Sequence, residues 1–336
     1  MNDADPSHQP SLDSKPEPLA PEPAPEPAAA GDLDPPVAPG HGSVSEGPGY
    51  LWHPVETPAS PVEPAPVASP PKLIPNFGHS LVFFALLVPA FIGGWIVTFG
   101  FLRLVLHTVA TQAVILRMGH EVRYAISAQA VAYGIQWGLA ALVFSLWWGR
   151  SLARGVHWNI SAAGRSFIRL ALLGVATGLV ITLAGNFLPM PKAPPILKDL
   201  TNSTAGAWML MAFGITLAPL TEELAFRGFL LPSLMNVFRW LERRGAMSES
   251  FVRAIGIPIA ILLTSIPFAM VHAQQVSGSW GPLLLIGMVS VVLCVIRLVT
   301  DSVAASFVVH ACYNFTLFAG LLVQTDGFRH LDKLKG

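Results

Sequence analysis

Residues 81–102 read LVFFALLVPAFIGGWIVTFGFL, a mostly apolar run without one charged side chain. Because a helix rises about 1.5 Å per residue, about 20 such residues cross the roughly 30 Å hydrocarbon core of a bilayer. Similar stretches follow at residues 124–148, 170–188, 204–221, 254–271, 281–296 and 302–325. The sequence therefore predicts an all-α, polytopic integral membrane protein of seven or eight transmembrane helices, with a multi-pass domain over residues 81–325.

The composition agrees with this class. Of the 336 residues, 52% are hydrophobic and 12% are charged, and the mean hydropathy is +0.55. Residues 1–72 hold 11 of the 20 acidic residues and 2 of the 20 basic ones, so the remainder holds 9 acids and 18 bases. These bases are scattered between apolar runs, as is typical of membrane flanks and not of a nucleic-acid surface. The two cysteines both lie in apolar runs, which excludes a disulfide framework.

The first 72 residues differ from the rest of the chain. They contain 19 of the 30 prolines and few clustered apolar residues, which predicts a disordered, acidic, Pro-rich tail. Such a tail serves as a tether or docks a partner protein. We expect no N-terminal signal peptide, because no basic segment precedes an early apolar stretch. With seven crossings, ten bases lie on the face of the tail and eight on the other, which predicts a cytoplasmic tail in a cell-membrane protein.

Two of the apolar stretches are irregular. The fourth continues its pattern past Pro219 to about Phe238, which predicts a kinked helix or two consecutive helices. The fifth contains Pro258 and Pro267. Broken helices at membrane depth are usually tolerated where they line a cavity, so this part of the sequence is where a site is expected.

Few ionisable residues lie at membrane depth. A charge at the centre of a spanning helix costs roughly 2.5–3.5 kcal/mol on insertion scales, so each such residue indicates a function. The residues concerned are Glu222, Glu223, Arg227, His272 and His310.

The two glutamates are adjacent and follow a proline. We expect a helix that begins just after Pro219, with Thr221 as its cap and both acids in its first turn. Glu223 and Arg227 are four residues apart and can pair on one face. Glu222 lies about 100° round the helix and is the freer carboxylate, so it is the better candidate for handling a proton or a water. The competing interpretation is a surface network at a helix end.

Two histidines belong to later stretches. His272 ends the fifth stretch, and Phe268 precedes it by one helical turn. His310 and Asn314 are four residues apart in the last stretch, so an imidazole and an amide face one neighbour. Taken alone, His272 is also typical of an interfacial or hydrogen-bonded core position. His310 and Asn314 are also typical of a hydrogen-bond pair between two helices. Their occurrence together favours a functional site, because three separate stretches supply groups suited to acid–base and oxyanion chemistry.

Other patterns in the sequence give no support for a different catalytic site. His120-Glu121 begins like the zinc-protease HExxH, but Tyr124 stands where the second histidine is needed. Cys312, two residues from His310, is best explained by packing in an apolar helix. There is no GxSxG motif for a serine nucleophile and no intramembrane aspartate pair.

Together the three motifs resemble the CPBP intramembrane protease family, the Abi group that includes type II CAAX prenyl endopeptidases. Its pattern is EExxxR, FxxxH and HxxxN, each on its own membrane helix. These stand here, in the same order on the fourth, fifth and seventh stretches, as Glu222-Glu223-x-x-x-Arg227, Phe268-x-x-x-His272 and His310-x-x-x-Asn314. The resemblance covers a protease-like core at about residues 200–320 and leaves the tail and the first three stretches uncovered.

The resemblance implies hydrolysis of a peptide bond inside the membrane. Glu222 would be the general base that activates water, helped by His272. His310 and Asn314 would bind the substrate carbonyl and stabilise its oxyanion. Glu223 and Arg227 would hold the helix and orient Glu222.

Several alternatives stay open. Glu222, His272 and His310 could offer zinc a His₂Glu set, and water activation without a metal is equally compatible with the residues. The substrate would be a prenylated CAAX-type peptide, another hydrophobic peptide or a membrane protein. A proton-coupled membrane transporter would also use intramembrane Glu and His, although no second copy of either motif is present. A non-catalytic scaffold or immunity protein of the same fold would act through the tail.

Overall fold

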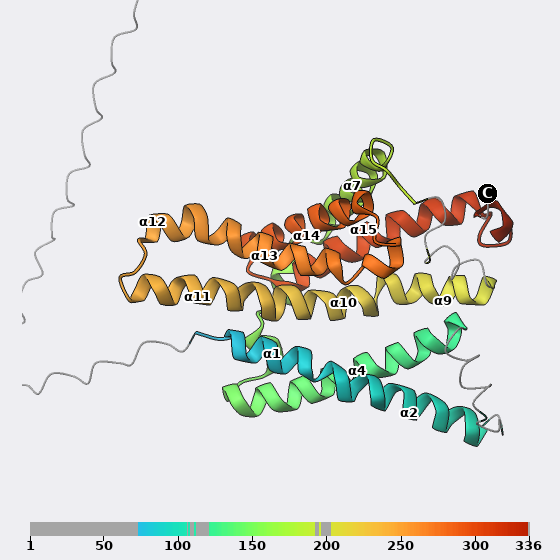
Figure 1. Cartoon of the computed structure of the whole chain (residues 1–336), viewed down its shortest axis with the longest axis horizontal. Helices are drawn as coiled ribbons and strands as arrows, with labels where there is room; N and C mark the ends of the chain where they lie inside the picture. Colours follow the sequence, from blue (N-terminus) through green and yellow to red (C-terminus); the bar gives the residue numbers. More distant parts are fainter. Residues whose placement is uncertain are drawn as a thin grey trace, which may run out of the picture. The chain divides into compact units, whose positions relative to one another are not determined.

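The computed structural model describes residues 73–105, 107, 111, 121–191, 195 and 203–334. The predicted tail of residues 1–72 and His120 of the HExxH-like stretch lie outside these ranges. Within them the regular structure is entirely helical (Figure 1).

Seven helical segments of the described ranges are long and apolar enough to cross a membrane. They are Phe77–Val105, Val122–Trp148, Phe167–Gly185, Thr204–Arg243, Glu249–Met270, Trp280–Thr300 and Val303–Gln324. Each coincides with one predicted stretch. The all-α, multi-pass membrane class is therefore confirmed, with seven candidate crossings in the described part of the chain.

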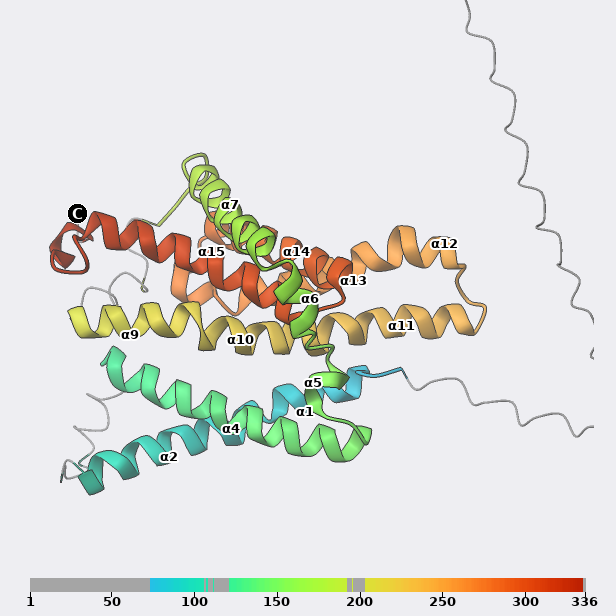
Figure 2. The same cartoon turned by 180° about the vertical axis from the view of Figure 1, so that it is seen from behind.

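The first three crossings come before the predicted site. They consist of α1 (Phe77–Ala85) with α2 (Leu87–Val105), α4 (Val122–Trp148), and α7 (Phe167–Gly185), which follows the short helices α5 (Leu152–Gly155) and α6 (Ile160–Arg165). In both views α2 and α4 run side by side, and the contacts between them are extensive (Figures 1 and 2).

The fourth crossing is a single helical path of 40 residues. It consists of α9 (Thr204–Ile215), α10 (Leu217–Glu223), the π-helix η1 (Leu224–Leu230) and α11 (Leu231–Arg243). The path breaks at Thr216, whose φ of −125° and ψ of −80° are not helical. The predicted interruption is thus present, three residues before Pro219.

The predicted start of the helix that carries the glutamates is wrong. Helix α10 begins at Leu217, and the Thr221 hydroxyl does not cap it but donates to the Leu217 carbonyl at 2.9 Å. Proline is tolerated in the first turn of a helix, where its missing N–H would have no partner. Pro219 therefore lies inside the first turn, and Glu222 and Glu223 lie at the end of α10.

The remaining elements complete the bundle. They are α12 (Glu249–Phe251), the π-helix η2 (Val252–Gly256), α13 (Ile257–Met270), the 3₁₀ helix η3 (Ala273–Val276), α14 (Trp280–Thr300), α15 (Val303–Gln324) and the 3₁₀ helix η4 (Leu331–Leu334). Pro267 lies inside α13.

Small residues allow α7 to lie close against α15. A β-carbon added at Gly174 would lie 2.5 Å from the Val309 carbonyl oxygen and 2.7 Å from Cβ of Cys312. One added at Gly178 would lie 2.7 Å from Cβ of Thr316. Glycines four residues apart are typical of such close contacts between membrane helices. Cys312 therefore faces α7, as expected of a packing residue.

Gly174→Ala is expected to destabilise the protein by about 1–3 kcal/mol, because its methyl group would overpack the contact between α7 and α15. Gly134→Ala in α4 is the matched control, since nothing lies within 4 Å of the added carbon. Thermal unfolding in detergent measures both. If Gly174→Ala unfolds at the same temperature as Gly134→Ala, the close packing is refuted.

The turn between α14 and α15 is tied to the loop before α6. Asp301 Oδ1 accepts from Arg297 Nη1 at 2.8 Å, and Asp301 Oδ2 accepts from His157 Nδ1 at 2.8 Å. The Val303 N–H donates to the His157 carbonyl at 3.1 Å. Partial burial would raise the pKa of Asp301, but the hydrogen bonds and charges of Arg297 and His157 outweigh it and hold this pKa below its usual value of 3.8.

This shift predicts a pH dependence of stability. A carboxylate with a lowered folded-state pKa stabilises the fold above its unfolded pKa, and this contribution is lost as the pH falls through the folded value. Because the Asp301 side chain is 67% exposed, the contribution is at most about 1 kcal/mol. Below about pH 4 the wild-type unfolding midpoint should therefore fall more steeply than that of Asp301→Asn. Parallel pH profiles of the two proteins would contradict this role.

Candidate active site within the membrane domain

A cavity of about 560 Å³ lies between α7, α9, α10, α13, α14 and α15. Leucine, isoleucine, valine and phenylalanine supply 11 of its 24 lining residues, and eight of the others have polar side chains. Cavities of this kind, mostly apolar with a few converging polar groups, are typical of ligand and substrate sites. The wall includes all four residues predicted to carry chemistry, which are Glu222, His272, His310 and Asn314.

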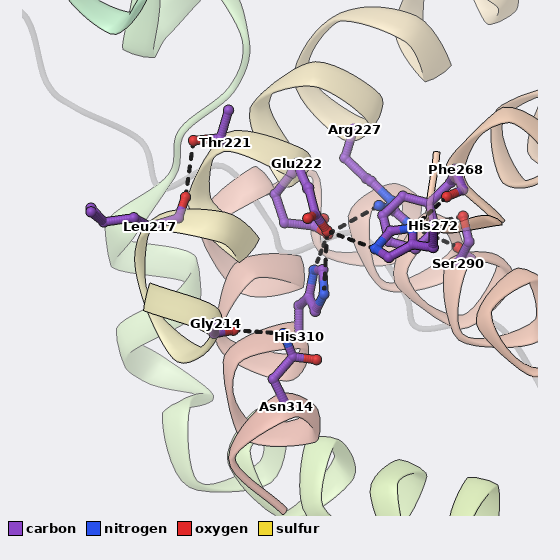
Figure 3. A network of polar contacts seen from close by, with 11 residues as sticks. Gly214, Leu217, Thr221, Glu222, Arg227, Phe268, His272, Ser290, His310 and Asn314 are labelled. Carbon is purple, nitrogen blue, oxygen red and sulfur yellow. Dashed lines mark hydrogen bonds and ion pairs between the residues drawn. The ribbon is translucent and has the colours of Figure 1, made fainter. Parts of the chain in front are cut away.

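Glu222 faces two imidazoles across this cavity (Figure 3). Its Oε2 lies 3.7 Å from Nε2 of His310 and 3.9 Å from Nε2 of His272. The Glu222 side chain is 21% exposed, whereas those of His272 and His310 are 16% and 4% exposed. The structure therefore brings together groups from α10, from α15 and from the turn between α13 and η3.

The Nδ1 atom of each imidazole has a hydrogen-bond partner, and this partner determines which of the two ring nitrogens carries the hydrogen. His272 Nδ1 lies 2.8 Å from the Phe268 carbonyl oxygen, and His310 Nδ1 lies 2.8 Å from Glu223 Oε1. Both partners only accept hydrogen bonds, so both Nδ1 atoms are assigned the hydrogen. In the neutral rings, the lone pairs at Nε2 then point toward Glu222. Three acceptor atoms therefore converge, namely Glu222 Oε2 and the Nε2 atoms of His272 and His310. A water molecule between them could donate hydrogen bonds to two of the three.

Glu223 and Arg227 form a buried ion pair, as their spacing predicts. Arg227 Nη1 donates to Glu223 Oε1 at 3.0 Å, and both side chains are 0% exposed. Arg227 Nη2 donates to the carbonyl oxygen and the hydroxyl of Ser290 at 3.0 and 2.8 Å. The guanidinium carbon lies 4.5 Å from the centre of the Phe268 ring. Each charge thus faces an opposite charge and makes at least one hydrogen bond, whereas Glu223 Oε2 and Arg227 Nε are buried without a hydrogen-bond partner among the described residues.

Two of these contacts are not apparent from the sequence. Ser290 belongs to none of the three motifs, and only its polarity within an apolar helix could have drawn attention to it. Glu223 was expected to orient Glu222, but its Oε1 accepts hydrogen bonds from Arg227 and His310. It therefore orients the imidazole that faces Glu222.

Asn314 lines the cavity but has a structural partner. Its Nδ2 donates to the Gly214 carbonyl at 2.7 Å, next to the break between α9 and α10. A carbonyl before such a break lacks its regular helical partner, and a side-chain amide can replace it. The helix-to-helix hydrogen bond considered for this residue is therefore present. One N–H of the amide remains for other contacts.

The possible zinc set matches zinc in its donor types but not in its arrangement. Two imidazoles and a carboxylate are ligands that zinc accepts. Among the residues that the structure describes, no group of three or more His, Cys, Asp or Glu side chains is placed to hold a metal ion. The reaction proposed below therefore uses no metal.

Comparison with family models gives one match. Residues 204–316 match the model described as type II CAAX prenyl endopeptidase Rce1-like. The matched region extends from the start of α9 into α15 and contains all seven predicted site residues. Searches of curated proteins and of solved structures find no match. The family match confirms the resemblance seen in the three motifs: residues 204–316, about a third of the chain, are similar to Rce1-like type II CAAX prenyl endopeptidases, a family of proteases.

Proposed function

We propose that the protein is an intramembrane endopeptidase in which Glu222, with two histidines, activates a water molecule for attack on a peptide bond. The main support is the convergence of Glu222 Oε2 and the Nε2 atoms of His272 and His310 within 3.9 Å in one cavity. A free carboxylate beside two imidazoles is suited to proton transfer, and the cavity has room for both water and substrate.

The proposed reaction begins with a water held between Glu222 and the imidazoles. Glu222 takes one proton while the water oxygen bonds to the substrate carbonyl carbon, which gives a tetrahedral intermediate. The carbon–nitrogen bond then breaks, and the leaving nitrogen takes the proton from Glu222. The second proton of the water passes from the new carboxylic acid to the amine, so the final products are a carboxylate and an ammonium group, and all atoms of one water are accounted for.

His310 is proposed to stabilise the charge that develops on the substrate oxygen. Its Nδ1–H is held by the Glu223 carboxylate, so that an imidazolium formed with a proton from solvent before the attack would be stabilised, as in other carboxylate–histidine pairs. The resulting Nε2–H can donate to the oxyanion. His272, oriented by the Phe268 carbonyl, is proposed to help in positioning the water. The remaining N–H of Asn314 can bind the substrate carbonyl.

The apolar wall supports a hydrophobic substrate. Leu210, Phe213, Leu285 and Leu317 contribute to it around the polar groups. We therefore propose a prenylated CAAX-type peptide, or another hydrophobic or membrane-inserted peptide, as substrate. The cytoplasmic position of the tail and its docking of a partner stay predictions, because the tail lies outside the described residues.

The test is cleavage of quenched fluorescent peptides, with and without a farnesyl group, by the purified full-length protein and by Glu222→Ala. The reaction is run in water enriched in ¹⁸O and analysed by mass spectrometry. We expect one ¹⁸O atom in the new carboxyl group with wild type and no product with Glu222→Ala.

Addition of a chelator distinguishes two kinds of protease. Turnover that survives the chelator supports water activation by glutamate and histidine alone, and turnover that disappears and returns with zinc supports the metal-dependent alternative. Equal product from wild type and Glu222→Ala would refute the proposed role of Glu222.

A further inference from the structure

A second cavity, of about 100 Å³, shares no lining residue with the first. It lies where the chain enters α1 and beside α11 and the end of α14. Its ionisable lining residues are His157, Arg239, Arg297 and Asp301. We propose that this cavity binds a phosphoryl oxyanion, and that its source is the headgroup of an anionic phospholipid.

Arg297 is the first observation that points to a ligand. The residue is only 7% exposed, and its Nη1 donates to Asp301 Oδ1 at 2.8 Å. Its Nε is buried and has no hydrogen-bond partner in the protein. A buried donor on a charged group is costly when it has no partner. Arg297 also lines the cavity, so a phosphoryl oxygen there could accept from its guanidinium group.

The charges of the cavity favour a single negative charge. Arg239 and Arg297 contribute two positive charges and Asp301 one negative charge. Because His157 holds the other carboxylate oxygen of Asp301 at 2.8 Å, this carboxylate is fixed at one side of the cavity. The net positive charge of one matches a phosphodiester, and arginine is the side chain best suited to bind phosphate oxygens.

The size of the cavity and its surroundings favour a lipid over free phosphate. Water takes about 30 Å³ per molecule in the liquid, so about 100 Å³ has room for a phosphate-sized group and not for a whole lipid. The two helices that line the cavity also carry exposed apolar side chains, with Val237 and Trp240 on α11 and Val295 and Val299 on α14. Acyl chains can lie along these helices while the phosphate enters the cavity.

The test measures lipid binding by the full-length protein in phosphatidylcholine nanodiscs that contain increasing fractions of phosphatidylglycerol. Native mass spectrometry counts the phosphatidylglycerol that stays bound, and the unfolding midpoint reports its stabilising effect. A second arm adds inorganic phosphate, at constant ionic strength, to nanodiscs of phosphatidylcholine alone.

Three variants separate this site from general attraction to a basic surface. Arg239→Gln changes an exposed residue, so the fold should be kept, and we expect about tenfold weaker binding of phosphatidylglycerol. Asp301→Asn removes the competing carboxylate, so we expect tighter binding. Arg150→Gln removes the same charge from an exposed residue that does not line the cavity, and we expect no change.

Opposite effects of Arg239→Gln and Asp301→Asn, with no effect of Arg150→Gln, would support the proposal. Equal binding by wild type, Arg239→Gln and Asp301→Asn would overturn it. Saturable binding of inorganic phosphate that Arg239→Gln weakens, without any preference for phosphatidylglycerol, would overturn the lipid as source and keep the oxyanion site.

Discussion

Arg227→Met is expected to lower the free energy of unfolding by about 3–5 kcal/mol, because it leaves the Glu223 carboxylate buried without its counter-ion. Arg227 also donates two hydrogen bonds to Ser290, so the substitution removes the one that the Ser290 hydroxyl accepts, while the Ser290 carbonyl keeps its place within helix α14. Thermal or denaturant unfolding in detergent micelles measures the loss.

The chain offers a matched control for this prediction. Arg253 and Glu249 form the same pair, four residues apart, but their side chains are 69% and 67% exposed. Arg253→Met should therefore cost less than about 1 kcal/mol. The double variant Glu223→Gln/Arg227→Met should recover part of the stability, because it removes both charges. If Arg227→Met and Arg253→Met cost the same, burial does not determine the strength of the first pair.

Glu222→Gln is expected to lower kcat by about 10²–10⁴ on any peptide that wild type cleaves, because the amide cannot take a proton from water. The amide keeps the shape of the side chain, so KM and the unfolding midpoint should change little. Steady-state kinetics with a quenched fluorescent peptide separate kcat from KM.

Glu249→Gln removes a carboxylate of the same kind at an exposed position outside the cavity, and its turnover should equal that of wild type. A Glu222→Gln protein that keeps a third or more of the wild-type kcat would exclude Glu222 as the general base. Loss of activity together with a lowered unfolding midpoint would assign it a structural role instead.

The membrane class could be predicted because the bilayer imposes a simple requirement. A spanning helix must satisfy its backbone internally and present apolar side chains over about 20 residues, so each crossing is visible as a run of letters. The pairing of Glu223 with Arg227 was also accessible, since helical spacing brings residues four apart onto one face.

Contacts between distant elements could not be predicted in this way. Nothing in the spacing of Ser290 or His310 relates them to Arg227 and Glu223, because these contacts depend on how α14 and α15 pack against η1. The break at Thr216 was displaced from its expected place, because a proline in a first turn does not interrupt a helix. The hydrogen bond from Asn314 Nδ2 to the Gly214 carbonyl could not be predicted either, because it depends on the position of that break.

The 40-residue path from Thr204 to Arg243 has a consequence for the depth of the reaction. At about 1.5 Å per residue it is about 60 Å long, twice the thickness of the hydrocarbon core. Glu222 lies near the middle of this path. The number of residues on either side of Glu222 therefore determines how far its carboxylate lies from each end of the path. Each residue inserted or deleted within the helical parts between Thr204 and Glu222 would move the carboxylate by about 1.5 Å along the helix, and rotate it by about 100°, relative to the start of α9.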